Sequence, residues 1–558
     1  MNRKERRAAA KRRQPMLSDS PLPSESGPID ALFATAFQRH QSGRLARAEE
    51  LYRQILAINP NHVDSLHFLG LIAHQVGRID VAINLIGRAI ELNGAVPEFH
   101  NNIGGAYHIS GKLDKAISHF RRALALNPDF VEAHFNLGKA LYVQGDINEA
   151  IEQYQRVITI RPDHVDAYNN LASTLYECGK YDQAIVHYQR ALSLEPSNSE
   201  VVYNLGLVLR AQGHLDEAVT QYRRAVALRA DFAEAHTNIG QALLLSGRFE
   251  EGWKEYEWRW KTNQMSGETR DFSAPVWSGA AIGDRVILLH AEQGFGDTLQ
   301  FCRYVPLLSA SAKIVLEVHP PLVRLLSRLR GVLAIVARGN RLPPFDLHCP
   351  LLSLPRAFGT TLNTIPAAVP YLSADPTLAA SWRERLDSLD GLRVGLAWAS
   401  NPDSLQDAAR QRDRRDKSIL PDELSLLAEV KELSFVSLQK AEAAVPTRKF
   451  PAGLVVHDWT DELEDFADTA ALVDGLDLVI SVDTAVAHLA GALDKPVWLM
   501  NRFDTDWRWL LNRDDSPWYP QLRQFRQPAP GDWISVITKV RDALRRLVAG
   551  DRDQLRAR

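Results

Sequence analysis

Cysteine is scarce in this sequence. The 558 residues include only three cysteines, Cys178, Cys302 and Cys349, and no two of them form a CxxC pair. Sparse, widely spaced cysteines suit a reducing compartment and lack the ligand spacing of a structural zinc site. We therefore expect a cytoplasmic protein that holds no structural metal.

Long apolar runs and a strong net charge are also missing. No window reaches the ~18 uninterrupted apolar residues of a membrane-spanning helix, and the net charge is only −3. A chain with so little net charge has no overall attraction to nucleic acid or to anionic membranes. We expect neither a nucleic-acid partner nor a membrane span.

The first 28 residues differ from the rest. Residues 1–13, MNRKERRAAAKRR, carry seven cations against one Glu, and residues 14–28 are rich in Pro and Ser. No apolar segment follows the cations, so a secretory signal is not expected. Contact with an acidic partner is one interpretation, but we favour a solvated, disordered arm over residues 1–28.

The main positive feature is an internal repeat. Glycine recurs every 34 residues, a period typical of tetratricopeptide repeats, in which each unit is a helix-turn-helix. A small residue and a large one recur in the same phase, as Ala116 and Phe120 do in one unit. The spacing predicts seven helix pairs over residues 29–262, stacked as an all-α superhelix with a concave groove. The recurring glycines are Gly43, Gly77, Gly111, Gly145, Gly179, Gly213 and Gly247.

Asparagine recurs at the same period on the first helix of successive repeats. An Asn side chain has two N–H donors and an acceptor oxygen, so a column of them can bind the backbone of an extended peptide in the groove. The alternative is that these residues only help the helices to pack. Both interpretations remain open at this point. The residues are Asn102, Asn136, Asn170, Asn204 and Asn238.

Alternating strand-like and helix-like segments follow the repeats. The seventh unit contains Trp253, Trp258 and Trp260, an aromatic face that we expect to dock on the next domain. Residues 263–283 form a linker, and short β-branched runs then predict one α/β half over 284–378 and another over 379–550, before a tail at 551–558. Such alternation is typical of parallel sheets covered by helices, with ligands at the carboxyl ends of the strands.

The turn at Gly294-Phe295-Gly296-Asp297 is the first candidate site. Leu299 occupies the third glycine position of a dinucleotide-binding GxGxxG, so neither a nicotinamide nor a flavin cofactor is expected. The two glycines allow a ligand to approach the backbone. Asp297 has two interpretations: a helix N-cap, or a base that takes a proton from an acceptor hydroxyl.

The second candidate site follows the apolar run 478–482. Asp483 and Thr484 precede a helix-like segment, and the backbone N–H groups of Thr484, Ala485 and Val486 are predicted to bind an anion such as the diphosphate of a nucleotide-sugar. A simply capped helix is the alternative. For His488, in the same segment, we favour a packed core position.

These two loops, GFGDTLQFCRYVPLL and SVDTAVAHLAGALDKPVW, resemble the signature loops of the ADP-heptose:lipopolysaccharide heptosyltransferase family, and more closely the bacterial proteins that fuse tetratricopeptide repeats to such a domain. The resemblance implies two Rossmann-like halves of the B-type glycosyltransferase fold and an inverting, metal-independent reaction. It also implies that Asp297 is the general base, that residues 483–488 hold the donor diphosphate, and that Lys417, or alternatively Arg415, supplies a cation.

The expected function is therefore transfer of a sugar from a nucleotide-sugar, a co-substrate, to an acceptor hydroxyl. The repeats resemble those of O-linked N-acetylglucosamine transferase over residues 30–261, which implies a protein or peptide acceptor held in the groove. Two alternatives are a transferase acting on a lipopolysaccharide-like glycan, with repeats that only recruit partners, and an inactive scaffold. The Trp-rich run 504–520 either stacks on a base or sugar, or anchors a long loop.

Overall fold

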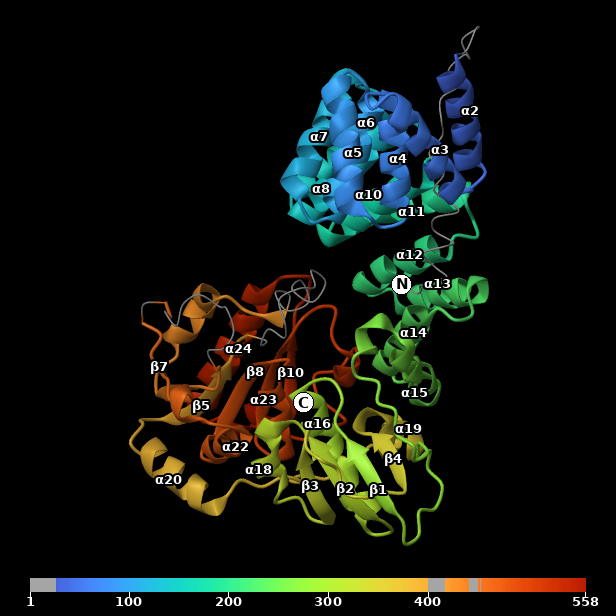
Figure 1. Cartoon of the computed structure of the whole chain (residues 1–558). Coiled ribbons are helices and arrows are strands. Elements are labelled where there is room, and N and C mark those ends of the chain that lie inside the picture. The colour runs from blue at the N-terminus through green and yellow to red at the C-terminus, as the bar shows by residue number, and fades with distance from the viewer. Residues whose placement is uncertain (1–26, 400–416, 441–449, 452, 558) are drawn as a thin grey trace. The chain divides into compact units, whose positions relative to one another are not determined.

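The computed structural model describes residues 27–399, 417–440, 450–451 and 453–557 (Figure 1). Its contacts define two compact units. The N-terminal unit runs to Leu209 and includes Ala227–Arg229; the C-terminal unit comprises Arg210–Val226 and the chain from Ala230 onward. None of the helices in the described part of the chain combines the length and apolarity that a bilayer crossing requires.

Paired helices make up the N-terminal unit and continue into the C-terminal unit. The turn glycine of every repeat has a positive φ, from +73° at Gly43 to +97° at Gly145. Since residues with a Cβ rarely adopt this backbone conformation, the turn explains the 34-residue glycine period. The helices are α2 (Pro28–Gln41), α3 (Leu45–Ile58), α4 (Val63–Gln75), α5 (Ile79–Leu92), α6 (Pro97–Ile109), α7 (Leu113–Leu126), α8 (Val131–Gln144), α9 (Ile147–Ile160), α10 (Val165–Glu177), α11 (Tyr181–Leu194), α12 (Ser199–Ala211), α13 (Leu215–Leu228), α14 (Ala233–Leu245) and α15 (Phe249–Tyr256).

The predicted small and large positions form the contacts inside each repeat. Ala116 is fully buried, and a Cβ added to Gly104 on α6 would lie 2.7 Å from the ring of Phe120 on α7. A small residue on one helix therefore makes room for the ring of its partner helix. The first helix of each repeat also starts with an acid in its first turn, where the positive end of the helix dipole favours it. These acids are Asp30, Asp64, Glu98, Glu132, Asp166, Glu200 and Glu234.

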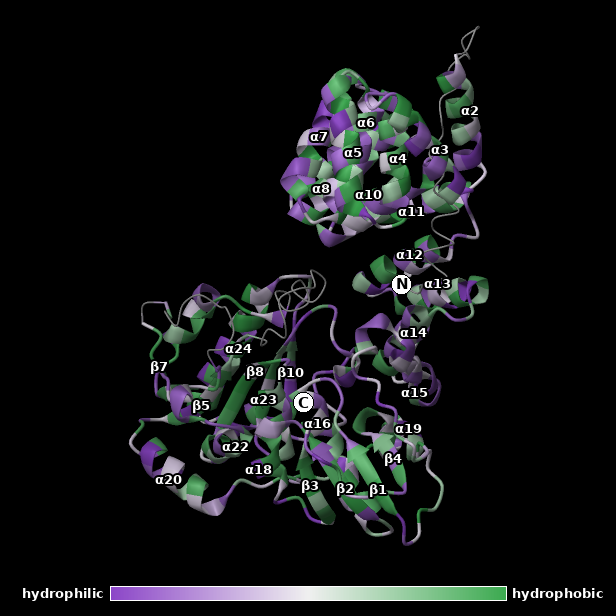
Figure 2. Cartoon of the chain, in the orientation of Figure 1, coloured by the Kyte–Doolittle hydropathy of each residue, from purple (hydrophilic) through white to green (hydrophobic). Residues whose placement is uncertain are grey.

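Two parallel sheets follow the repeats in the C-terminal unit. The described part of the chain contains ten strands, and in Figure 2 strands such as β1 (Val286–His290) and β8 (Leu478–Val482) are mainly green, because strands covered by helices on both faces are apolar throughout. The first sheet has the order β3-β2-β1-β4 and the second β10-β9-β8-β5-β6-β7. The strands are β1 (Val286–His290), β2 (Lys313–Val318), β3 (Val332–Ala337), β4 (Leu347–Pro350), β5 (Leu392–Ala397), β6 (Leu433–Ser437), β7 (Val456–His457), β8 (Leu478–Val482), β9 (Val497–Asn501) and β10 (Leu522–Arg526).

Helices connect these strands, as the parallel order requires. Between β1 and β2 lie α16 (Phe295–Phe301) and α17 (Val305–Ser309), and α20 (Pro376–Leu386) joins the two sheets in sequence. In the second α/β half, α22 (Phe466–Asp474) precedes β8, α23 (Ala485–Ala492) connects β8 to β9, and the C-terminal α24 (Trp533–Val548) follows β10. The predicted α/β class of residues 284–550 is confirmed.

One apolar core joins the last repeat to both α/β halves. It contains Phe249, Trp253 and Tyr256 of α15 together with strands β1 and β2 and the buried Trp507. The seventh repeat thus docks as expected, but of the three tryptophans named for this contact only Trp253 lies in the core, and Trp258 stacks on His236 of the same repeat. The segment 263–283, predicted as a linker, also packs on the first sheet, where Trp277 donates its backbone N–H to the carbonyl of His348 at 2.7 Å.

Candidate functional site

The two predicted loops meet through the helices that follow them. Helix α16 packs on α23, and Gly296 lies at the contact: an added Cβ would be 2.9 Å from Cδ2 of His488 and 3.7 Å from the Cα of Ala485. Helix packing therefore accounts for Gly296. Gly294 is different, because its nearest neighbour would be Oδ2 of Asp297 at 3.6 Å and its φ is −91°. Of the two glycines, only Gly294 would accept a Cβ at ordinary van der Waals distance from its neighbours.

Asp297 makes two contacts with its two oxygens. It is the third residue of α16, and its Oδ2 accepts a hydrogen bond from the N–H of Gly294 at 3.0 Å. Its Oδ1 forms an ion pair with the Nη2 of Arg508. The N-cap interpretation is therefore wrong, because the N-cap residue is Gly294 and Asp297 hydrogen-bonds back to it from the first turn of the helix. Asp297 also belongs to a charged cluster that reaches into the second α/β half.

Arg508 is the centre of this cluster. Its Nε donates to Oε1 of Gln300 at 2.7 Å and its Nη1 to Oδ1 of Asp506 at 2.8 Å. Burial alone would raise the pKa of Asp506, but Arg508 and Lys417 lower this pKa to about 2. The carboxylate of Asp506 therefore stays charged and helps to hold the guanidinium in place. The sequence pattern singles out neither residue; its one signal is an arginine between two tryptophans in the loop after β9.

Lys417 and Asp483 complete the cluster. The Nζ of Lys417 lies 4.0 Å from Oδ2 of Asp483, the residue that follows β8. Burial raises the pKa of Asp483, and the charge of Lys417 opposes this shift. The predicted cation and the predicted loop are thus neighbours. Arg415, the alternative cation, lies outside the described residues.

The start of α23 faces the same region. The hydroxyl of Thr484 hydrogen-bonds Oγ of Ser481 at 2.9 Å and does not cap the helix. Within the described ranges, no protein group accepts the N–H of Ala485 or of Val486, and both residues are partly exposed. Two free N–H groups at a helix start can bind an anion.

His488 and the tryptophans are core residues. The Nδ1 of His488 lies 2.9 Å from the hydroxyl of Tyr519, its ring stacks on Trp509, and burial lowers its pKa to about 3. Trp507, Trp509 and Trp518 are 3%, 0% and 0% exposed. These rings anchor the loop, as one of the two interpretations has it, and are not exposed for stacking on a base or sugar.

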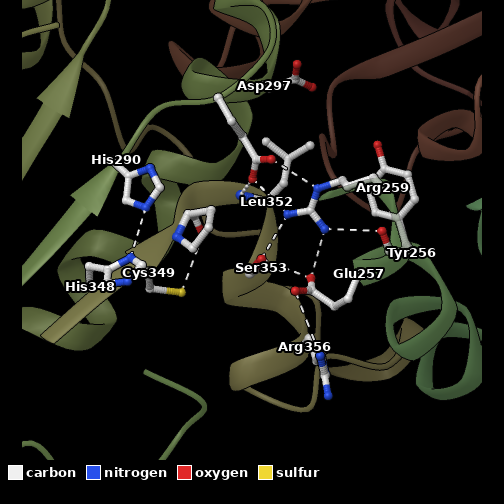
Figure 3. A network of polar contacts seen from close by, with 12 residues as sticks. Tyr256, Glu257, Arg259, His290, Asp297, His348, Cys349, Leu352, Ser353 and Arg356 are labelled. Atoms are coloured by element: carbon white, nitrogen blue, oxygen red, sulfur yellow. Dashed lines mark hydrogen bonds and ion pairs between the residues drawn. The ribbon is translucent and has the colours of Figure 1, made fainter. Parts of the chain in front are cut away.

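A second polar network lies beside Asp297 and begins in the seventh repeat (Figure 3). Arg259, 2% exposed, forms two hydrogen bonds with the carboxylate of Glu292, at 3.0 Å and 2.9 Å. Its other donors bond Ser353, Glu257 and the carbonyl of Tyr256. Burial alone would lower the pKa of Arg259, but the two glutamates raise it above its ordinary value. Glu292 lies in the loop between β1 and α16, so this network fixes the approach to Asp297.

The asparagine column makes contacts within the repeat array. In four members the side-chain Nδ2 donates a hydrogen bond, and three of these bonds reach back 35 residues into the preceding repeat. The bonds are from Asn102 to Nε2 of His67 at 2.9 Å, from Asn136 to Asn101 at 3.0 Å, from Asn204 to Asn169 at 3.0 Å and, within α14, from Asn238 to the carbonyl of Glu234 at 3.1 Å. Asn170 hydrogen-bonds Tyr154. All five are partly exposed, and one bond does not use up an amide. The column therefore helps packing and still offers polar groups.

No group of three or more His, Cys, Asp or Glu side chains with the arrangement of a metal site occurs in the described part of the chain.

Comparisons with known proteins match each region separately. Tetratricopeptide-repeat families match residues 39–91 and, in overlapping segments, 104–247, and glycosyltransferase family 9 (heptosyltransferase) matches residues 464–498. Protein FlbA of Caulobacter vibrioides is 25% identical over 323 residues, which is 53% of this chain and 52% of FlbA. The chain thus spans about half the length of this relative.

Among solved structures, that of MamA is 25% identical, covers 32% of this chain and 99% of MamA, and has a TM-score of 0.28. That of YrrB, described as a tetratricopeptide-repeat protein with an unusual peptide-binding site, is 17% identical, covers 33% and 95%, and has a TM-score of 0.30. The family matches identify the N-terminal region as tetratricopeptide repeats and give residues 464–498 a partial likeness to a glycosyltransferase family.

Proposed function

We propose that this chain is an inverting glycosyltransferase of the B-type fold, which moves a sugar from a nucleotide-sugar to a hydroxyl of a protein held by the repeats. One observation carries the proposal: Asp297, Arg508, Asp506, Lys417 and Asp483 form one charged cluster beside the free N–H groups at the start of α23. The match to glycosyltransferase family 9 supports it, because the matched residues 464–498 include that helix start.

The proposed reaction is a single displacement. The acceptor oxygen attacks the anomeric carbon of the sugar, the bond from this carbon to the diphosphate breaks, and the electron pair leaves with the diphosphate. Asp297 takes the acceptor proton. Each carboxylate oxygen has two acceptor sites, so the bonds to Gly294 and Arg508 leave room for a hydroxyl. Attack from the face opposite the leaving group inverts the anomeric carbon.

The leaving diphosphate gains negative charge, and the cluster contains the groups that stabilise it. Lys417 provides a cation, and the N–H groups of Ala485 and Val486 provide donors at the positive end of a helix dipole. These groups do the work that a divalent ion does in other transferases. We propose, on this basis, a reaction that needs no metal ion.

The protein acceptor is proposed from the repeats. Their partly exposed asparagines offer amide groups at a regular spacing, which suits an extended backbone better than a branched glycan. A glycan acceptor and an inactive scaffold are the other outcomes that the experiment distinguishes.

The test starts with donor binding. Thermal unfolding of the full chain is measured with UDP-, GDP-, ADP-, CMP- and dTDP-sugars, with and without magnesium. A donor at 100 times its Kd adds about 2.7 kcal/mol of stability. One donor should stand out without magnesium, and its labelled sugar is then followed into protein and into glycan fractions. If the labelled sugar appears only in the glycan fraction, the proposal of a protein acceptor is rejected. If no nucleotide-sugar binds, the inactive-scaffold alternative is favoured.

Asp297→Asn then tests the base against a matched control. Asp468 has the same structural position: it is the third residue of α22, it accepts the N–H of Glu464 at 3.0 Å, and it pairs with Arg324. Asp297→Asn should lower transfer by at least about a hundredfold, because general bases contribute 10²–10⁴-fold, while donor affinity stays within a few-fold. Asp468→Asn should cost less stability, because Arg324 is 45% exposed whereas Arg508 is 9% exposed, and it should leave transfer within about twofold. Equal transfer by the two variants would remove Asp297 from the role of base.

A further inference from the structure

The seventh repeat differs from the other repeats in what it touches. Its second helix, α15, ends at Tyr256 and continues into a 3-10 turn, Glu257–Lys261, that carries Arg259. These residues belong to the same compact unit as both α/β halves. A repeat that only extended the peptide groove would need no contact with the loops of the candidate site, yet this one contacts two of them.

The first contact runs through the loop after β9. Trp507 packs edge-on against Trp253, with ring centroids 5.2 Å apart, and against Tyr256 at 6.1 Å. The next residue is Arg508, whose guanidinium lies 4.2 Å from the Trp507 ring and pairs with Asp297. Because Trp507 is 3% exposed, its position is set by the repeat on one side and by Phe301 on the other.

The second contact runs through the loop before α16. Arg259 uses all five of its N–H donors, and two of them fix Glu292. Gln293 follows with a φ of +53°, an uncommon value for a residue with a side chain. The hydroxyl of Tyr256 hydrogen-bonds the side chain of Gln293. Gly294, which caps α16 and donates to Asp297, comes next.

We propose that Tyr256 and Arg259 of the seventh repeat are positioning residues for Asp297, so that the last repeat is part of the active site. The inference rests on the proposed function, in which Asp297 acts on the acceptor hydroxyl. The repeat fixes both loops that bond Asp297, one through Glu292 and Gln293 and the other through Trp507 and Arg508. A shift of about 1 Å in a reacting group lowers rate strongly without changing the groups present.

The chain offers a matched pair of variants for the test. Tyr188 occupies the position of Tyr256 two repeats earlier, is equally buried, and hydrogen-bonds the hydroxyl of Ser173 at 2.8 Å. Tyr256→Phe and Tyr188→Phe therefore each remove one hydroxyl and one hydrogen bond from a repeat core. Arg259→Lys is the stronger variant, because it breaks the two-point contact with Glu292.

Three quantities are measured on the full chain: unfolding temperature, kcat and KM for the donor, and hydrogen exchange of the amides of residues 293–298. Each Phe variant should lower the unfolding temperature of its own unit, Tyr188→Phe that of the N-terminal unit and Tyr256→Phe that of the C-terminal unit. Tyr256→Phe should lower kcat about fivefold to tenfold, with KM for the donor within twofold, and speed exchange in residues 293–298. Tyr188→Phe should change neither. Arg259→Lys should lower kcat further.

The outcomes separate this inference from the proposed function. Suppose that the wild type turns over no nucleotide-sugar, but that hydrogen exchange in residues 293–298 is faster in Tyr256→Phe and unchanged in Tyr188→Phe. The transferase is then rejected, while the inference that the seventh repeat positions the Asp297 loops is kept. Unchanged exchange in Tyr256→Phe and Arg259→Lys overturns the inference whether or not the wild type is active. Equal kcat values for the two Phe variants overturn it as well.

Discussion

Gly296→Ala should separate helix packing from ligand access in the first candidate loop. The added methyl would lie 2.9 Å from Cδ2 of His488, whereas two carbon atoms prefer about 3.5–4.0 Å. His488 cannot move aside easily, because it hydrogen-bonds Tyr519 and stacks on Trp509. The contact is therefore relieved by moving α16 away from α23 by roughly 0.6–1 Å.

Such overpacking costs about 1–3 kcal/mol, and the higher helix propensity of alanine offsets up to about 1 kcal/mol of it. We expect Gly296→Ala to destabilise the C-terminal unit by about 1–2 kcal/mol. Calorimetric unfolding of the full chain measures this, with the transition of the C-terminal unit assigned by adding the bound donor.

Gly294→Ala is the control, two residues away. Its φ of −91° suits any residue, and the nearest atom to the new methyl would be 3.6 Å away. Loss of glycine at an N-cap should cost less than about 1 kcal/mol. If Gly294 admits a ligand, this variant keeps its stability and loses affinity for donor or acceptor. Equal stability of Gly296→Ala and the wild type would refute the packing argument.

Three further predictions concern the cluster, the column and the core. Lys417→Ala should weaken nucleoside-diphosphate binding about tenfold in calorimetric titration. Lys431 is an exposed lysine that hydrogen-bonds the carbonyl of Ala428, and Lys431→Ala should leave this affinity unchanged. Equal affinities of the two variants would mean that another residue supplies the cation. Asn136→Ala and Asn101→Ala remove the same inter-repeat hydrogen bond, so they should lower stability by similar amounts. Only the partly exposed Asn136 should be needed for peptide binding, so only Asn136→Ala should weaken peptide affinity in fluorescence anisotropy. Equal peptide affinities of the two variants would mean that the asparagine column serves packing alone. Burial lowers the pKa of His488 to about 3, below the value of about 6.5 in the unfolded chain, so between these pH values the unfolded state binds more protons and stability should fall as pH falls. His488→Gln should make this loss of stability less steep. An unchanged slope, measured by unfolding at a series of acidic pH values, would assign the loss of stability to other histidines.

Periodicity made most of the fold predictable. Positive φ at the turns requires glycine in every repeat, and parallel strands covered on both faces require continuous apolar runs, so each rule leaves a local signature. The segment 263–283 was harder to predict, because Trp277 packs on the first sheet through contacts with β4 that have no sequence period.

The site was only partly predictable for a related reason. Asp297 and Asp483 follow strands and precede helices, which is a recognisable local pattern. Arg508 lies in an irregular loop and gains its role from Asp297, 211 residues earlier in the chain. Gly296 belongs to the recognisable loop, but the reason for a glycine there is His488 on another helix. Contacts made across the fold leave no spacing to detect.

The charge of the cluster gives a pH dependence for donor binding. Asp297, Asp483 and Asp506 supply three carboxylates, and Lys417 and Arg508 supply two cations, so the ionised cluster carries a net charge of −1. An anionic diphosphate binds less well next to this excess negative charge. Burial raises the pKa of Asp483, so Asp483 protonates before Asp506, which has a pKa of about 2 and stays charged.

Donor affinity should therefore increase as pH falls through the pKa of Asp483, because protonation brings the cluster to neutrality and releases Lys417 from its carboxylate. The Asp483→Asn variant should bind donor tightly already at neutral pH, and its donor affinity should not change with pH. Asn has nearly the same shape as Asp but lacks the charge that titrates. Calorimetric titration of nucleotide-sugar at a series of pH values, lowered stepwise from neutral, measures this dependence. Weaker donor binding by Asp483→Asn at every pH would instead mean that the carboxylate is needed to hold Lys417 in the position that meets the diphosphate.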